Sequence, residues 1–129
     1  MKSLTVQNPW AYAIFHCGKL IENRSRKTNY RGRILIHVSK QEQMNPMTSE
    51  YQREFMRHIM GKNPLAGNII GSVEIIDCIK SEDDGSLQST LWGNFYCWHW
   101  ILKGPIRFDK PIPARGMLGL WEYKGEIPA

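Results

Sequence analysis

Residues 8–24 read NPWAYAIFHCGKLIENR and join a short helix to an extended, charged segment. Asn8 followed by Pro9 is typical of a helix start, because the Asn side chain can cap the first turn and proline gives up no hydrogen bond there. Gly18 can adopt the left-handed conformation that ends many helices. Between them, apolar residues recur at i, i+3, i+4 and i+7, which predicts one buried helix face made by Trp10, Ala13, Ile14 and Cys17.

The segment after this helix, residues 19–24, is predicted to be extended. Alternation then places the side chains of Glu22 and Arg24 on one face, close enough to form an ion pair. Lys19 follows the helix end, where the carbonyl dipoles favour a positive charge. These groups could hold a phosphate or a nucleobase, with Lys19 as a point charge, Arg24 as a planar fork and Glu22 as acceptor or base. The alternative is an internal ion pair that only orders the strand.

Outward from this stretch, the chain is rich in strand-like runs. β-Branched and alternating apolar residues predict strands at residues 3–6, 33–39, 69–79, 95–102 and 116–123, and both faces of the third are expected to be largely covered. Ser49 and Gln52 have the spacing of a capping box, which predicts a second helix from there to about Met60.

Two further segments are predicted to be irregular. Residues 81–89 are polar and are expected to form a loop. A looser segment is expected from Arg107-Phe108, because Pro111 and Pro113 cannot donate the hydrogen bonds of a central strand. The whole pattern predicts an α+β fold in which a twisted, mostly antiparallel sheet or barrel carries two short helices.

Length and composition are those of a globular protein. The chain has 129 residues, 42% hydrophobic and 22% charged, which predicts a single domain spanning residues 1–129. The longest uncharged stretch, residues 85–102, is too polar and too aromatic for a membrane span. The first ten residues lack the apolar run of a signal peptide, so a soluble, cytoplasmic protein is expected. The three cysteines form no CxxC pair, and reduced thiols are expected.

The positive charge is concentrated in one segment. The net charge is +5, but residues 19–40 alone carry +6, because seven basic residues face the single acid Glu22. Such a concentration suits contacts with phosphates, since the release of cations from a polyanion drives binding without sequence readout. A solvated basic face without a ligand is the alternative. The seven basic residues are Lys19, Arg24, Arg26, Lys27, Arg31, Arg33 and Lys40.

Several stretches resemble, in the same order, those of the ASCH (activating signal cointegrator homology) domain family, whose fold is akin to the RNA-binding PUA domain. They are QNPW at 7–10, GKLIENR at 18–24, YRGRILIHVS at 30–39, GSVEIID at 71–77, WHW at 98–100 and GMLGLW at 116–121. The resemblance implies a PUA-like, small, mostly antiparallel β-barrel with two or three short helices at its ends. It also implies a cleft beside the barrel, lined by Lys19, Glu22 and Arg24.

Family members are proposed to bind RNA, and some cleave RNA or remove acyl groups from modified cytidine. The resemblance therefore favours an RNA- or nucleotide-binding module in RNA metabolism. The alternative is a metal-independent ribonuclease or an amidohydrolase of modified nucleosides, so whether the chain is an enzyme stays open at this point. In that alternative Lys19 would stabilise developing charge and Glu22 would act as acid or base, which makes these two the candidate catalytic residues.

The acyl-removing members use a lysine, a threonine and a distant glutamate. Lys19 matches the lysine, but Glu22 stands where the threonine is expected. Glu74 is a nearby acid on a different element from the glutamate of that pattern. This departure weighs against the amidohydrolase alternative.

Further binding residues are expected around the cleft. One exposed aromatic near a basic groove can stack a base, and Trp98 is the candidate, while the other tryptophans are expected in the core. A track of phosphate contacts is expected to continue over Arg26, Lys27, Tyr30, Arg31 and Arg33.

No cofactor, metal or membrane partner is expected. Phosphate-cradling glycine loops and dinucleotide fingerprints are missing from the sequence. Cys97 with His99, and His16 with Cys17, match no standard zinc-ligand spacing. RNA is the expected partner, and a protein partner would need an exposed apolar patch.

Overall fold

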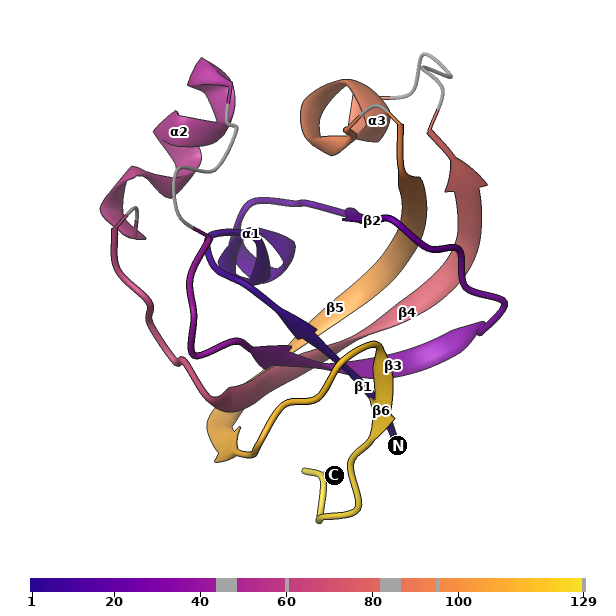
Figure 1. Ribbon diagram of the computed structural model, residues 1–129. Helices are drawn as coiled ribbons and strands as arrows, with labels where there is room; N and C mark the ends of the chain where they lie inside the picture. Colours follow the sequence, from indigo (N-terminus) through magenta and orange to yellow (C-terminus); the bar gives the residue numbers. More distant parts are fainter. Residues whose placement is uncertain (44–48, 60, 82–86, 95, 129) are drawn as a thin grey trace.

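The computed structural model describes residues 1–129 apart from 44–48, 60, 82–86, 95 and 129. Strands dominate the described chain, and the helices are short (Figure 1). In chain order the elements are β1 (Lys2–Val6), α1 (Trp10–His16), β2 (Ile21–Arg24), β3 (Gly32–Val38), α2 (Glu50–Met56), the 3-10 turn η1 (Arg57–Ile59), β4 (Asn68–Lys80), α3 (Leu87–Trp92), β5 (Trp98–Pro113) and β6 (Leu120–Glu122).

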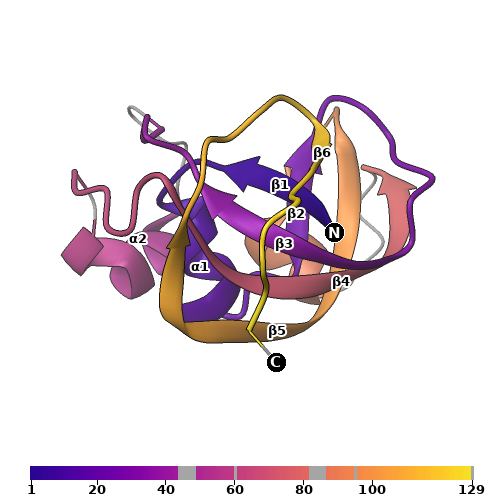
Figure 2. The same cartoon turned by 90° about the horizontal axis from the view of Figure 1, so that it is seen from below.

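The strands form one curved sheet in the order β2-β5-β4-β3-β1-β6. Every neighbouring pair is antiparallel except β1 and β3, which run parallel. The long strands β4 and β5 bend strongly, with register shifts along their shared ladder, and α1 lies on the concave side of the sheet (Figures 1 and 2). The predicted α+β fold, a PUA-like, small, mostly antiparallel β-barrel with short helices, is confirmed, and the sheet forms a half-barrel.

Helix α1 begins and ends close to the predicted residues. Ala13 and Ile14 are fully buried on its inner face. The helix starts at Trp10, so Pro9 and not the predicted Asn8 has the N-cap position. The Asn8 side chain still reaches the first turn, where Oδ1 accepts a hydrogen bond from the Tyr12 amide at 3.2 Å. Gly18 has a φ of +68°, so the predicted left-handed stop is confirmed.

Among the residues that the structure describes, three clusters of buried side chains hold the fold together. Most of the apolar core lies inside the curve of the sheet, between α1 and the strands. A smaller cluster, Ala13, Met56, Ile59 and Trp92, joins the helices to one another. A third, Leu35, Ile69 and Trp121, lies on the outer face. Within the described ranges, no helix is long and apolar enough to cross a bilayer.

The looser segment predicted from Arg107-Phe108 is wrong, because β5 continues to Pro113. Its first residues pair with both β2 and β4, but the stretch that contains Pro111 and Pro113 pairs with β4 alone. A proline is tolerated in a strand where its missing N–H faces no neighbour. The prolines therefore mark the half of β5 that has one partner strand.

Other boundaries also differ from the predictions. Residues 87–89, predicted as loop, begin helix α3, and the predicted loop residues 82–86 lie outside the described ranges. The far end of β4 is open to solvent, with Ile76 and Ile79 exposed, so only the first half of that strand is covered on both faces. The last strand is shorter than predicted and spans Leu120–Glu122.

The capping box at the start of α2 is confirmed, with reciprocal hydrogen bonds of 3.1 Å between Ser49 and Gln52. The helix continues as the 3-10 turn to Ile59, and Met60, where the prediction ended, lies outside the described residues.

Candidate functional site

The two ends of the curved sheet approach each other at a seam between β1 and β2. Strand β6 pairs with β1 only as far as Leu4, so the Thr5 carbonyl lies beyond that ladder. The Nη2 of Arg24, at the end of β2, donates a hydrogen bond to the Thr5 carbonyl oxygen at 2.9 Å. Arg24 therefore links the ends of the sheet across the seam.

A cavity of about 580 Å³ opens at this seam. Its volume is within the range of small-molecule binding sites. Strand ends, the helices and the connection before β6 all contribute to its wall. The lining residues are Thr5, Val6, Gln7, Trp10, Lys19, Glu22, Asn23, Arg24, Ser25, Ser39, Gln43, Gln52, Trp92, Asn94, Met117, Leu118 and Gly119.

Three of the side chains that line the cavity are charged and form one cluster, Lys19, Glu22 and Arg24. Lys19 is only 1% exposed, and its Nζ donates to the Ile21 carbonyl and, at 3.0 Å, to Glu22 Oε1. The same Nζ lies 5.8 Å from the centroid of the Trp10 ring, within the range of a cation–π contact. Arg24 Nε donates to Glu22 Oε2 at 2.9 Å. Glu22 is thus bonded through both oxygens, one to each cation.

This arrangement keeps the Glu22 carboxylate ionised. Burial by itself raises the pKa of the Glu22 carboxyl, but the charges and hydrogen bonds of Lys19 and Arg24 outweigh it and hold this pKa below its ordinary value of 4.5. The cluster therefore has two positive charges and one negative charge at neutral pH. Of the three side chains, Arg24 is the most accessible, at 29% exposed.

The backbone at the outer edge of β2 also faces the cavity. The Leu102 amide donates to the Leu20 carbonyl at 2.9 Å where the β2–β5 ladder begins. Backbone groups alternate between the two edges of a strand, so those of Ile21 and Asn23 point away from β5. The Ile21 carbonyl oxygen already accepts a hydrogen bond from Lys19 Nζ. The Asn23 amide and carbonyl therefore lie at the cavity edge of the strand.

The Asn23 side chain positions one wall of the cavity. Its Nδ2 donates to the Trp92 carbonyl at 2.9 Å, and its Oδ1 accepts from the Asn94 amide, also at 2.9 Å. These bonds fasten the connection between α3 and β5 to β2. The Nε2 of His99 lies 2.9 Å from the Asn94 carbonyl oxygen, so this ring nitrogen is directed at backbone.

The sequence model of the ASCH domain family matches residues 4–112, which is most of the chain. The chain belongs to the ASCH domain family. Activating signal cointegrator 1 of Homo sapiens is 27% identical over 136 residues, and the protein of the same name from Mus musculus is 26% identical. Each alignment covers 96% of this chain but 22% of the relative, so the ASCH domain described here spans about a fifth of their length.

Of the predicted binding residues, the structure brings Lys19, Glu22 and Arg24 together in the cavity of the ASCH domain. Arg26 and Lys27 are exposed and follow Ser25, which lines the cavity. The other predicted residues do not line it.

Arg31 and Tyr30 lie further along the loop between β2 and β3. Arg31 Nη1 donates to the Thr28 and Tyr30 carbonyls, and its Nη2 lies 3.7 Å from an Asp77 oxygen. Tyr30 is half-buried and packs against the main core.

Arg33 and Glu74 are paired across β3 and β4, on the same side as the outer-face residue Leu35. Arg33 Nη1 donates to Ser72 Oγ at 2.9 Å. Trp98 is half-buried at the start of β5, directly opposite Arg24. Glu74, the acid weighed for the amidohydrolase pattern, therefore lies outside the cavity lining.

Of the residues that line the cavity, the sequence analysis identified only Lys19, Glu22 and Arg24 as site residues, and four of the others show why. Trp10 was expected in the core but is half-buried beside Lys19, and Asn23 carried no recognised signal. Asn94 and Met117 belong to connections that only the tertiary fold brings to the seam. Of these, only Asn23 was open to prediction, since it alternates with two charged neighbours on one short strand.

Proposed function

We propose that this ASCH domain binds RNA, or a nucleotide-like part of RNA, in the cavity at the seam. The proposal rests on the way the Arg24 guanidinium is held at the cavity. Glu22 and Thr5 fix its guanidinium at the cavity, and among the described residues its Nη1 makes no hydrogen bond. Because Nε and Nη2 are engaged, a guanidinium held in this way offers the N–H groups of Nη1, already oriented, to a phosphate.

The other groups of the cavity suit the remainder of a nucleotide. Trp10 offers aromatic surface for a base, and the Asn23 backbone offers one donor and one acceptor for a base edge. The net charge of the Lys19–Glu22–Arg24 cluster is +1, which complements one phosphodiester rather than a polyphosphate. Outside the cavity, Arg26 and Lys27 would continue the phosphate contacts, while Tyr30, Arg31 and Arg33 stay predicted contacts.

A hydrolytic role for Lys19 and Glu22 stays a prediction with less support. A general acid needs a proton near neutral pH, whereas the pKa of Glu22 is lowered. A general base needs a free lone pair facing the substrate, and both Glu22 oxygens already accept hydrogen bonds. Lys19 is buried and bonded to two acceptors. Binding without turnover fits this geometry better.

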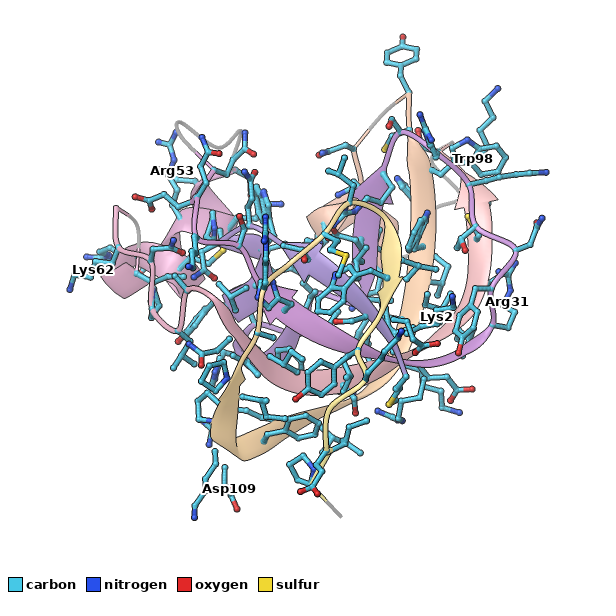
Figure 3. The ribbon with its side chains drawn as sticks, turned by 60° about the horizontal axis from the view of Figure 1, so that its bottom comes forward. Lys2, Arg31, Arg53, Lys62, Trp98 and Asp109 are labelled. Atoms are coloured by element: carbon cyan, nitrogen blue, oxygen red, sulfur yellow. The ribbon has the colours of Figure 1, made fainter. Side chains whose placement is uncertain are left out.

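Arg24→Ala is expected to weaken the binding of mixed short RNAs about tenfold, because it removes a charged hydrogen-bond donor from the cavity. Affinity is measured by fluorescence anisotropy between about 50 and about 200 mM salt, with the products of incubation analysed in parallel. Lys62→Ala is the matched control, since Lys62 is exposed and lies at the opposite side of the molecule from Trp98 and Arg31 (Figure 3).

The salt dependence of RNA binding gives a second readout for the basic loop, which is the connection between β2 and β3 that carries Arg26, Lys27 and Arg31. Replacing Arg26, Lys27 and Arg31 with glutamate is expected to lower both the affinity and the slope of log affinity against log salt. Wild-type affinity and slope in this variant, together with an Arg24→Ala protein that binds normally, would disprove the proposal. RNA products that disappear in Lys19→Ala would establish the hydrolase alternative instead.

A further inference from the structure

Trp98 lies between two basic residues on the neighbouring strands. A set of residues that are directly opposite one another across the strands is called a rung here. In the register of the strands, Arg24 of β2, Trp98 of β5 and Lys80 of β4 are directly opposite one another. Side chains on one rung project to the same side of a sheet. That side is the concave one, because Trp98 packs against the core cluster inside the curve. Trp98 is half-buried and Lys80 is exposed.

The basic loop after β2 borders the same tryptophan. Two residues further along these strands, and so on the same face, Glu22, Trp100 and Cys78 are opposite one another. The Trp100 Nε1 donates to the Arg26 carbonyl at 2.9 Å, and the Thr28 amide donates to Cys78 Sγ at 3.5 Å. The loop therefore crosses the concave face over that rung, immediately beside Trp98.

We propose that Trp98, Lys80 and the loop residues Arg26 and Lys27 form a second nucleotide subsite next to the cavity. This inference rests on the proposed function, since it assigns the nucleotide adjoining the one bound beside Arg24. The base of that neighbour stacks on the open part of the Trp98 ring. The domain then recognises at least a dinucleotide of single-stranded RNA.

The geometry of the rung fits this assignment. Neighbouring strands are about 4.8 Å apart, so Arg24 and Lys80 originate roughly 10 Å from each other on either side of Trp98. A base on the tryptophan thus has a cation on each side for the flanking phosphates. Stacking on an aromatic ring tolerates any base, whereas the cations add salt dependence. The acids Glu82, Asp83 and Asp84, which follow Lys80 in the sequence, lie outside the described residues.

The test compares probes of one and two nucleotides on the full chain. Isothermal titration calorimetry measures the affinities of the four ribonucleoside 5′-monophosphates and of the four matching 5′-phosphorylated dinucleotides. The wild-type protein is expected to bind the dinucleotides about tenfold more tightly. Trp98→Ala is expected to reduce this ratio to about one, and Trp98→Phe to retain most of it.

Lys80→Ala provides a variant that keeps the packing of the core, because Lys80 is exposed. It is expected to lower the dinucleotide affinity and its salt slope, whereas Lys62→Ala keeps both. Equal wild-type affinities for the two probe lengths, or an unchanged ratio in Trp98→Ala, would overturn the second subsite while leaving cavity binding intact. Failure of both probes to bind would overturn the proposed function as well.

Discussion

Glu22→Gln is expected to lower the free energy of unfolding by about 3–5 kcal/mol. The reason is Lys19, which is 1% exposed and whose ammonium group loses its counter-charge in this variant. Arg24 Nε loses a charged acceptor at the same time. Equilibrium unfolding in urea measures the loss, and circular dichroism of the folded state checks that the sheet is retained.

The double variant Lys19→Met/Glu22→Gln separates an unpaired charge from lost packing. Removing one partner of a buried ion pair leaves an uncompensated charge, whereas removing the charge of both Lys19 and Glu22 leaves no unpaired ammonium group in the interior. The double variant is therefore expected to be more stable than Glu22→Gln alone. Equal stability of the two would show that an uncompensated charge on Lys19 is not the source of the loss.

The lowered pKa of Glu22 fixes the direction in which its contribution to folding stability changes with pH. Because the folded-state pKa of Glu22 lies below its ordinary value of 4.5, its stabilising contribution is present above that value. The contribution is lost as the pH falls through the folded-state pKa. The stability difference between wild type and Glu22→Gln is thus expected to be largest near neutral pH and to shrink in acid. A difference that grows toward acid pH would contradict the lowered pKa.

Gly71→Ala is expected to destabilise the fold by about 3 kcal/mol, at the upper end of typical overpacking costs. Gly71 lies in β4 between β3 and β5, opposite Ile36 and Arg107. A Cβ built there would lie 2.3 Å from the Ile106 carbonyl oxygen and 2.6 Å from Phe15 Cε1. The first neighbour is backbone of the paired strand, so the ladder itself must shift. Urea unfolding again gives the magnitude.

Two variants test whether the clash with backbone is the cause. Phe15→Leu combined with Gly71→Ala relieves only the contact with the ring, so most of the loss is expected to persist. Gly61→Ala adds a Cβ at a φ of +76° with no atom within 4 Å, and it is expected to cost about 1–2 kcal/mol through backbone conformation alone. Gly71→Ala as mild as Gly61→Ala would argue against a rigid contact at Ile106.

Local sequence signals predicted the parts of the fold that local interactions determine. The helix that ends at Gly18 and the capping box at Ser49 are each fixed within a few residues, and both are confirmed. Helix α3 (Leu87–Trp92) was missed because its three middle residues after Leu87, Gln-Ser-Thr, are polar and the preceding segment is polar as well. It is held by tertiary bonds, in which Gln88 accepts from the Leu20 amide and donates to the Gly18 carbonyl.

The candidate site was predictable only along β2. Strict alternation places Glu22 and Arg24 on one face, and the structure shows them bonded there. The cavity also needs Thr5, Asn94 and Met117, which meet only because the sheet curves until its ends adjoin. Such a seam depends on strand order and register shifts, and neither can be obtained from periodicity.

The central claim, that a nucleotide binds in the cavity beside Arg24, is tested most directly by a ¹H–¹⁵N NMR titration with the four ribonucleoside 5′-monophosphates. We expect the Trp10 indole signal and the backbone amides of Asn23 and Arg24 to shift with saturable, salt-sensitive behaviour. The backbone amide of Lys62, which donates to the Ile59 carbonyl at 2.9 Å and lies outside the cavity lining, serves as an unperturbed reference. Absence of these shifts, or shifts confined to the side of the molecule that carries Lys62, would contradict the account.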